Sequence, residues 1–397
     1  MALNDFKPHF DNAYQEIFQK VLVSKKIANM RFKSVLKYGE SIERVAYDIT
    51  NVLVRDTVRG SASTIDSITD SSELLTINTE KEANFHLSDG EMTQAGPLNP
   101  GMIIGGKVAH KVATDFDARV FAQIPNAANT FDTGDLTTLA STGTPITLST
   151  TTVPQMVTRM SAKLRANNQL LTNLAFVIDS YGAAEMNEYL LSKNIDLAGS
   201  VYANGYSGQV DNAEVYVSEN LTGSGVLSMA TQATAADTVI INGVTFTFVA
   251  AIGTTAGNVL LGDNVDEARA NLATLINTPG TTTATGVAVS EDDQITLADM
   301  TVVDSASADT LTLTAIGSGT LTLSETLTDE DDAWTKNYIN CYFGKKGGID
   351  AVMQDMKDVD VRPTSDRRGN NIFSSYLAGI KTFADGAKKF LNVKIAR

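Results

Sequence analysis

The sequence predicts an α+β protein whose chain is interrupted by an inserted β-rich domain. Residues 222–332 form a block rich in Thr, Ala, Gly, Ser and Asp. Its only aromatic residues are Phe246 and Phe248, and the next aromatic residue is Trp334. Apolar residues at four-residue steps between positions 104 and 120 predict a long helix before that block. Strand patterns precede this helix and recur after the block. A β-rich module inside another domain's sequence is most simply an insertion at a surface loop.

Charge divides the chain at the same place. The 397 residues carry 31 basic and 46 acidic side chains, a net charge of −15. Between Gly225 and Ala333 a single basic residue, Arg269, stands against fifteen acidic residues, so this stretch carries −14 of the total. The acidic balance argues against a free nucleic-acid-binding protein, because such a protein needs a basic surface.

Composition limits the class of protein further. Hydrophobic residues make up 43% and charged residues 19%, which allows a sizeable core and excludes a disordered chain. The one cysteine, Cys341, excludes an internal disulfide framework and a cysteine-rich zinc module. The apolar runs are far shorter than the roughly 18 residues of a membrane span, and residues 1–7 contain no apolar signal core. A cytoplasmic protein without a membrane partner is therefore expected.

Within the acidic block, local patterns predict a hairpin, one helix and further short strands. Asn242-Gly243 lies between two β-branched runs and supplies the positive φ values of a tight turn. Asn264 and Glu267 have the spacing of a capping box that opens a helix. Short strands are expected at 286–289, 294–297, 311–314 and 321–323. A module of about 110 residues is large enough to fold alone.

The part of the chain before the block predicts an exposed arm. Asp5 can cap an amphipathic helix that continues to residue 22. Residues 41–89 follow as a long β-hairpin, with arms at 42–55 and 74–87 and a polar connection at 60–72. A hairpin of this length with a polar tip cannot bury itself, so it is expected to protrude and to clamp a neighbouring subunit.

A long helix and a mixed region complete the host part. Asn99-Pro100 starts the helix, since proline is tolerated in a first turn. Its apolar seam is formed by Ile104, Val108, Val112, Phe116 and Val120. The remaining expected elements are helices at 153–166 and up to 191, a buried strand at 174–179, and strands at 214–218, 338–343, 359–361 and 373–383.

This order of elements resembles the major capsid proteins of tailed bacteriophages with the Hong Kong 97-type fold. Two stretches carry the resemblance most closely. One is FVID at 176–179 with the helix after it and GQVDNAEVYVSENL at 208–221. The other is QDMKDVDVR at 354–362 with DRRG at 366–369 and YLAGIK at 376–381. The resemblance covers about residues 1–221 and 334–397 and leaves the acidic block outside.

The resemblance implies an N-terminal arm (1–40), an extended loop (41–89), a peripheral domain with a spine helix (90–180), an axial domain (181–221 and 334–352) and closing strands of the peripheral domain (353–397), with 222–333 as the inserted domain. It further implies a structural subunit of an icosahedral shell, which self-assembles into pentamers and hexamers and encloses double-stranded DNA non-specifically. The implied partners are copies of the same chain, a separate scaffolding protein, a portal protein and, as an option, a decoration protein. The implied location is the virion, assembled in the host cell cytoplasm.

The sequence predicts no catalytic, cofactor-binding or metal site, and hence no enzyme. Three histidines lie on different expected elements without metal-ligand spacing: His9, His86 and His110. Cys341 lies in an apolar strand without a nearby histidine, as an inert buried thiol does. The turn 344–348 lacks the spacing of a phosphate loop, and residues 329–332 lack that of a calcium loop. Nothing near Lys81, the lysine of the hairpin, marks it as activated, so an isopeptide cross-link to a neighbour is not expected.

Two other classes stay open at this point. An encapsulin, a nanocompartment of the same fold, is disfavoured by the acidic insertion and the phage-type closing strands. A phage tail protein or surface adhesin is suggested by the Thr-rich β module and predicts fibres instead of shells. Electron micrographs and sedimentation distinguish these classes.

Overall fold

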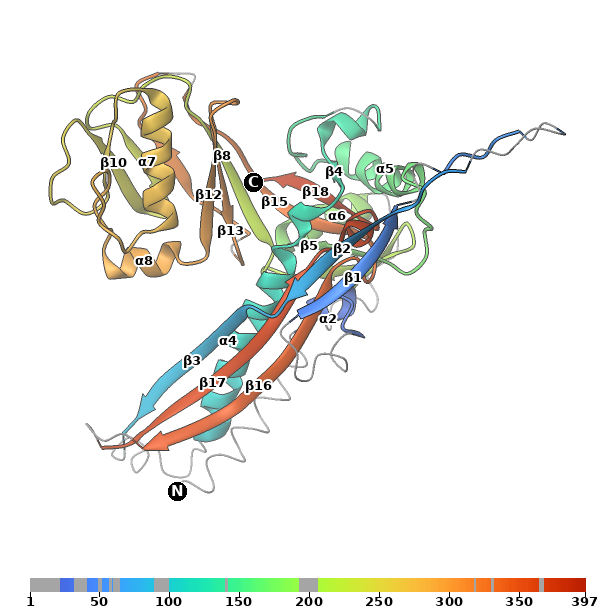
Figure 1. Cartoon of the computed structure of the whole chain (residues 1–397), viewed down its shortest axis with the longest axis horizontal. Coiled ribbons are helices and arrows are strands. Elements are labelled where there is room, and N and C mark those ends of the chain that lie inside the picture. Colours follow the sequence, from blue (N-terminus) through green and yellow to red (C-terminus); the bar gives the residue numbers. More distant parts are fainter. Residues whose placement is uncertain are drawn as a thin grey trace. The chain divides into compact units, whose positions relative to one another are not determined.

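The structure is a computed structural model that describes residues 22–31, 41–48, 52–56, 59, 65–88, 100–139, 142–192, 206–317, 319–329, 332–363 and 368–397 (Figure 1). Nearly all of the predicted N-terminal helix, His9 and residues 60–64 of the hairpin connection lie outside these ranges. The described residues form both helices and strands in several sheets, so the predicted α+β class is confirmed.

The chain divides into two compact units. The first consists of Met1–Ala113 with Gly347–Ala387, and the second of Thr114–Lys346 with Lys388–Arg397. The long helix α4 (Pro100–Phe121) contributes to both units. The chain therefore leaves the first unit along α4, returns to it after Lys346, and ends in the second unit.

The first unit contains two small sheets. Its other elements are α2 (Ser24–Ile27), β1 (Ser41–Asp48), β2 (Thr69–Thr76), β3 (Thr79–Leu87), β16 (Asp350–Pro363), β17 (Asn370–Lys381) and α9 (Ala384–Ala387). Strands β1 and β2 form an antiparallel hairpin, in which Ser41 lies opposite Thr76 and Asp48 opposite Thr69. A separate antiparallel sheet has the order β16-β17-β3.

Two features of the predicted hairpin are wrong. Residues 69–72, which were expected in the polar connection, belong to β2 and pair with residues 45–48 of β1. Residues 79–87 were expected to continue its second arm, whereas they form β3 and pair along their whole length with β17. Ile77 and Asn78 separate β2 from β3. Ile77 is buried in one cluster with Leu75, Val352 and Phe383, so burial of these apolar side chains fixes the junction at which β2 ends and β3 begins.

The predicted seam of α4 becomes more buried along the helix. Ile104 and Val108 are half-buried, whereas Val112, Phe116 and Val120 are buried. The exposed Lys107 and Lys111 lie on other faces of the same helix. The four-residue spacing therefore identified the face that the helix buries.

Replacing Val112 with Asp should destabilise the protein by about 3 kcal/mol, because the carboxylate enters a site that is only 6% exposed. Urea unfolding of the isolated subunit measures this change. Lys107→Asp, on the exposed side of α4, is the matched control and should shift stability by less than about 1 kcal/mol. Equal stabilities of the two variants would show that Val112 is not a core residue.

The second unit is built on one large sheet. Nine of the described strands belong to it: β4 (Asn129–Phe131), β5 (Leu174–Ile178), β6 (Tyr206–Val210), β7 (Ala213–Val217), β8 (Thr222–Ser228), β12 (Met300–Ser305), β13 (Thr310–Ala315), β15 (Trp334–Lys345) and β18 (Phe390–Ala396). The main path has the order β12-β13-β8-β15-β5-β7-β6, while β18 pairs with β15 and β4. Helices η3 (Ile124–Asn126), η4 (Thr133–Leu136), α5 (Thr152–Ala166) and α6 (Ser180–Ser192) accompany the host strands.

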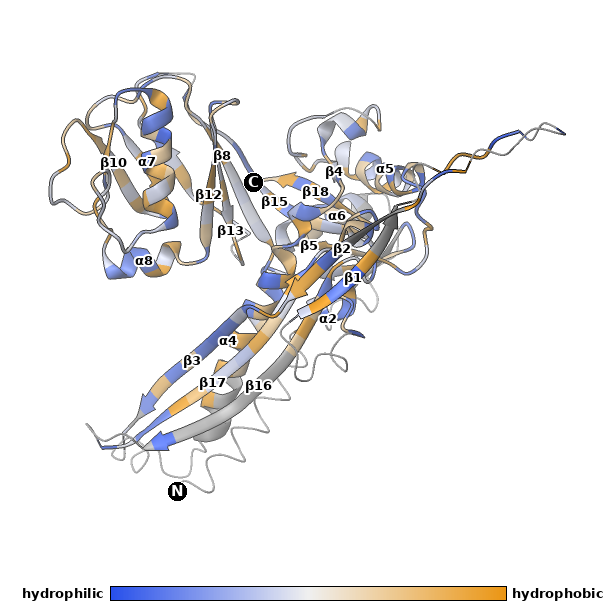
Figure 2. Ribbon diagram, in the orientation of Figure 1, coloured by the Kyte–Doolittle hydropathy of each residue, from blue (hydrophilic) through white to orange (hydrophobic). Residues whose placement is uncertain are grey.

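Strand β15 holds this sheet together. Its first half pairs with β8, its second half pairs with β5, and β18 lies along its other edge. All five residues of β5 are buried. Figure 2 colours the ribbon by hydropathy and marks hydrophobic positions on β18 in orange. Gly344 on β15 is a close-approach position, since a Cβ there would lie 2.4 Å from the Cα of Phe390.

The acidic block at residues 222–333, called the inserted segment below after its predicted place in the sequence, adds a second sheet and two helices. Strands β9 (Thr238–Ile241), β10 (Val244–Val249), β11 (Asn258–Leu260) and β14 (Leu323–Glu325) form a sheet of order β11-β10-β9-β14. The predicted turn is confirmed, with φ of 49° at Asn242 and 86° at Gly243. The Asn264 half of the predicted capping box is confirmed, because the Asn264 side chain accepts a hydrogen bond from the Glu267 amide at the start of α7 (Val265–Asn277). The Glu267 carboxylate accepts from the amide of Asp263, one residue before the expected partner.

The prediction of a strand at 294–297 is wrong, because these residues lie in helix α8 (Glu291–Leu297). Ser290 caps this helix by accepting a hydrogen bond from the Asp293 amide, and three acidic residues occupy its first turn. Carboxylates are favourable at a helix N-terminus, so this local signal outweighs the β-branched composition of the segment. Residues 287–289 form no strand, and the expected strand at 321–323 begins only at Leu323.

The inserted segment has a core of its own. A cluster of buried apolar residues draws all its members from Leu227 to Leu321, and Trp334 packs against it. Helix α7 contributes Ala268, Leu272, Leu275 and Ile276 to this cluster. At its border the segment continues the host sheet, because β8 pairs with β15 from Leu227 opposite Trp334 to Thr222 opposite Asn340.

Candidate assembly surface

The β1–β2 hairpin is anchored at its base. Arg44 forms ion pairs with Asp385, at 2.5 Å, and with Asp350, at 3.7 Å. Glu73 accepts hydrogen bonds from the amide of Ala384, at the start of α9. The base of the hairpin is therefore fixed to β16 and α9 of its own unit.

Beyond β1 and β2 an ion pair keeps the two arms together. The two terminal nitrogens of the Arg55 guanidinium, Nη1 and Nη2, each donate to a carboxylate oxygen of Asp66 at 2.7 Å, and Asp66 also accepts from the Leu53 amide at 2.9 Å. These hydrogen bonds, first that of Arg55 and then that of Leu53, lower the pKa of Asp66. The carboxylate is therefore charged at neutral pH, and the pair is lost as the pH falls through this lowered pKa.

The hairpin carries most of the exposed large apolar side chains of the described chain. Seven of the eleven lie between positions 45 and 74: Val45, Val52, Leu53, Val54, Ile65, Ile68 and Leu74. We call these seven residues the arm surface. Val54 is fully exposed and Ile65 is 92% exposed. Single exposed apolar residues are ordinary, but this concentration on one projecting element is typical of a surface that another chain covers.

The structure separates the histidines that the sequence singled out. His86 on β3 is half-buried and its Nδ1 lies 2.9 Å from Oδ1 of Asn371, whereas His110 is exposed on α4. Burial raises the pKa of the Cys341 thiol well above its usual value, which makes this cysteine unreactive at neutral pH. Among the described residues no three His, Cys, Asp or Glu side chains come together as a metal site.

The other candidate residues serve structural roles. Lys346 of the basic turn binds the Glu214 carboxylate at 2.5 Å and lies 3.3 Å from the Tyr216 hydroxyl. Asp332 accepts hydrogen bonds from the amides of Ala230 and Thr231, which ties together the two ends of the inserted segment. Lys81 lies on β3 opposite Tyr376.

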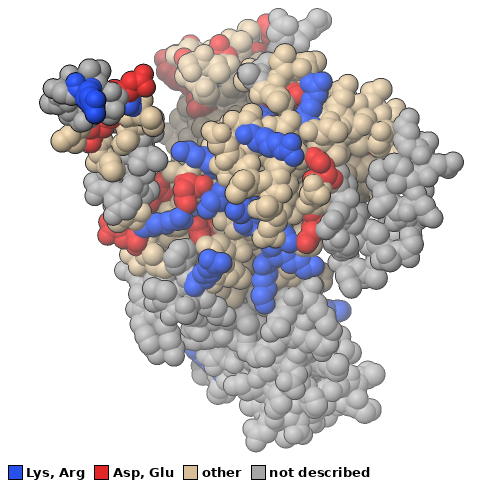
Figure 3. Space-filling view, turned by 90° about the vertical axis from the view of Figure 1, so that its right-hand side faces the viewer, with Lys and Arg blue, Asp and Glu red and all other residues tan. Residues whose placement is uncertain are grey.

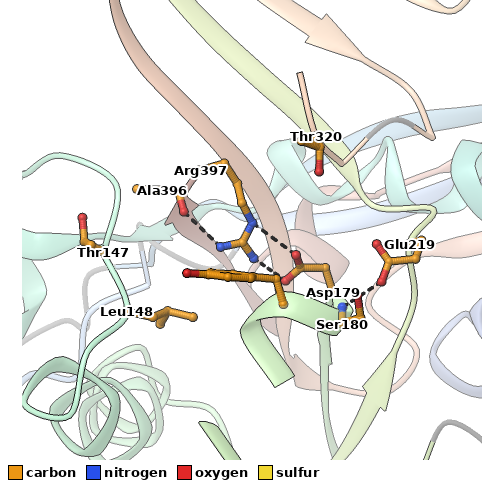
Figure 4. A pocket seen from close by; sticks show the side chains of 9 residues that line it. Thr147, Leu148, Asp179, Ser180, Glu219, Thr320, Ala396 and Arg397 are labelled. Carbon is orange, nitrogen blue, oxygen red and sulfur yellow. Dashed lines mark hydrogen bonds and ion pairs between the residues drawn. The ribbon is translucent and has the colours of Figure 1, made fainter. Parts of the chain in front are cut away.

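A pocket of about 500 Å³ in the second unit escaped the sequence analysis (Figure 4). Asp179 caps α6 through the Gly182 amide and binds the guanidinium of Arg397, which stacks on the ring of Tyr181 at 4.8 Å. Glu219 accepts a hydrogen bond from the Ser180 amide at 2.8 Å. Because these charged groups bind each other and a helix terminus, we interpret the pocket as a structural junction. Its partners are more than 200 positions apart, and no local pattern reveals them.

Outside residues 225–333 the sequence carries 30 basic and 31 acidic residues, so its charges nearly balance. Figure 3 shows Lys and Arg side chains interspersed with Asp and Glu on one face. Of the helices in the described ranges, none has the length and apolar character needed to cross a membrane.

Comparison with known proteins finds similar structures but no similar sequence. No family model matches the sequence, and no curated protein matches it. A structure of Mycobacterium phage Che8 is 14% identical with a TM-score of 0.43, and the match covers 93% of this chain and 90% of that one. The capsid structure of cyanophage P-SCSP1u is 12% identical with a TM-score of 0.44, over 90% and 84% of the two chains.

The chain is similar to phage capsid structures. This is the resemblance that the order of its elements predicted. A virus-like particle from Pyrococcus furiosus is also similar, at 10% identity and a TM-score of 0.39 over 97% of this chain and 96% of that one.

Proposed function

We propose that this protein is the major capsid protein of a tailed bacteriophage, a structural subunit of an icosahedral shell and not an enzyme. The arm surface is the observation that carries the proposal. A hairpin that is anchored at its base and carries exposed apolar side chains is unfavourable in an isolated subunit, because these side chains need cover that the described part of the chain does not supply. A neighbouring copy supplies that cover, and repeated heterologous contacts of this kind close into rings.

The rings are the pentamers and hexamers of the shell, which encloses double-stranded DNA without reading its sequence. Outside residues 225–333 the chain has 30 basic and 31 acidic residues, so its attraction for phosphate groups is weak. Weak attraction suits a shell that is filled with DNA and later emptied. A separate scaffolding protein, a portal protein and, as an option, a decoration protein complete the assembly in the host cytoplasm, and the mature location is the virion.

Residues 222–333 form an inserted domain that lies on the outside of the shell. Its separate core and its charge support this proposal. Arg269, its one basic residue between Gly225 and Ala333, is fully buried, so no basic side chain of this stretch faces solvent. Inside the shell such a surface would repel packaged phosphates over a Debye length of about 8 Å, whereas outside it favours solubility.

Expression of the chain with and without a scaffolding protein, followed by electron microscopy, tests the function. Closed shells built of ring-shaped capsomers are expected, and an antibody raised against residues 222–333 should label them while intact. Fibres, or monomers under every condition, would contradict the proposal. Closed shells that enclose an enzyme and exclude DNA would instead identify an encapsulin, and labelling of broken shells alone would place the segment inside.

A further inference from the structure

The C-terminal end of α4 is buried on more than one side. Phe116, Val120 and Phe121 are 0% exposed, and Ala118, on a different face, is 5% exposed. A helix at a protein surface usually keeps one polar face in water. The end of α4 therefore has a second cover besides the core against which its apolar seam packs.

The inserted segment supplies that second cover. Gly317, in the turn after β13, lies so close to the helix that a Cβ in its place would be 2.8 Å from the Cβ of Ala118. Gly317 also has φ of +71°, a conformation that side-chain-bearing residues rarely adopt. A small residue on the helix and a glycine in the turn thus permit direct contact between the two.

An ion pair lies beside this contact. The guanidinium of Arg119 on α4 binds the carboxylate of Asp299, in the turn between α8 and β12, and lies 3.4 Å from Asp115. The Arg119 side chain is only 17% exposed, so its direction is fixed by these partners. The Asp299 carbonyl accepts a hydrogen bond from the Ile316 amide, which joins the two turns that touch the helix.

The chain after Gly317 stays against the host sheet. The side chain of Asn337 on β15 donates a hydrogen bond to the Leu321 carbonyl at 2.9 Å. A Cβ on Gly319 would lie 3.6 Å from Ile339 of the same strand. The inserted segment is thus fastened to its host at several points away from its two ends.

We propose that the inserted segment acts as a brace, which holds the C-terminal turns of α4 in place through Asp299 and Gly317. Helix α4 is shared by the two compact units, and the braced residues come directly after the point at which it enters the second unit. The brace goes beyond the proposed function, since it acts within one subunit and gives the segment a role in setting the host's own geometry.

Hydrogen exchange on the unassembled full-length subunit tests the brace, independently of whether the chain forms shells. Asp299→Lys places two cations side by side, so the amides of residues 116–121 should exchange about fivefold faster, as expected for loss of a partly exposed ion pair. Gly317→Ala should accelerate the same amides, because the added methyl displaces Ala118. The matched control is Asp292→Lys, which makes the same charge change on the exposed side of α8 and should leave them unchanged.

A charge swap provides the positive control. Combining Arg119→Asp with Asp299→Arg should restore slow exchange in residues 116–121 in part, since the new carboxylate at position 119 regains a cation but also faces Asp115. Unchanged exchange in the Asp299→Lys and Gly317→Ala variants would overturn the proposal. Equal acceleration in α4 and in strands β9 and β10 would also overturn it, because the substitution would then unfold the segment instead of releasing the helix.

Discussion

Replacing Val54 and Ile65 with Asp should abolish shell formation while the subunit stays folded. Both side chains face solvent in the subunit, so the substitutions cost little stability on folding. In the proposed shell both are covered by a neighbouring copy, where an unpaired carboxylate costs several kcal/mol at every contact. A loss of 1.4 kcal/mol of binding free energy lowers the association constant of one contact about tenfold. Because a closed shell contains many copies of this contact, the loss applies at each of them. Sedimentation and electron microscopy measure the yield of closed particles.

Ile295→Asp is the matched control for the arm surface. Ile295 is 75% exposed, but it lies on α8 of the inserted segment and outside the arm surface. This variant should assemble as the wild type does. Normal shells from the Val54→Asp, Ile65→Asp variant would show that the hairpin is not an assembly element, whereas a lowered melting temperature of its monomer would show that these residues belong to the subunit's own core.

Replacing Arg269 with Met should destabilise the inserted segment by about 3 kcal/mol, at the lower end of the cost of breaking a buried ion pair. The fully buried guanidinium donates to the Met229 carbonyl at 2.6 Å and to Asp304 at 3.1 Å, and it also binds Asp266 and Asp309. Met fills a similar volume without donors, which leaves the carbonyl and three carboxylates without their cation. The lower end applies because Asp266 and Asp309 are half exposed and regain water.

The single tryptophan makes this loss measurable. Trp334 packs against the core of the inserted segment, so its fluorescence during urea unfolding reports on that core. Arg269→Lys should be intermediate, because a lysine keeps the charge but cannot contact all the partners. Asp266→Asn, at a side chain 61% exposed, should change stability by less than about 1 kcal/mol. If the Arg269→Met variant unfolded at the same urea concentration as the wild type, the buried ion pairs of Arg269 would not stabilise the segment.

Local patterns predicted the elements whose hydrogen bonds and caps lie within a few residues. The Asn242-Gly243 turn, the Asn264 cap and the apolar seam of α4 were all visible in the sequence, because turns and helices close their hydrogen bonds over short distances. The missed helix α8 had the same kind of signal in Ser290 and Asp293, and its β-branched residues obscured it. Composition and charge alone indicated the inserted segment, since these are sums over the chain.

The sequence by itself thus determined the class, the long helix, the exposed hairpin and the acidic segment. The tertiary structure alone decided which strands pair: β3 joins β17 instead of extending the hairpin, and β8 carries the inserted segment into the host sheet through β15. It alone placed Asp299 on Arg119, 180 positions away, and Arg397 on Asp179, 218 positions away. A strand forms its hydrogen bonds with another strand, and a charged side chain pairs with whichever opposite charge the fold brings near. The local periodicity of the chain therefore predicts neither partner.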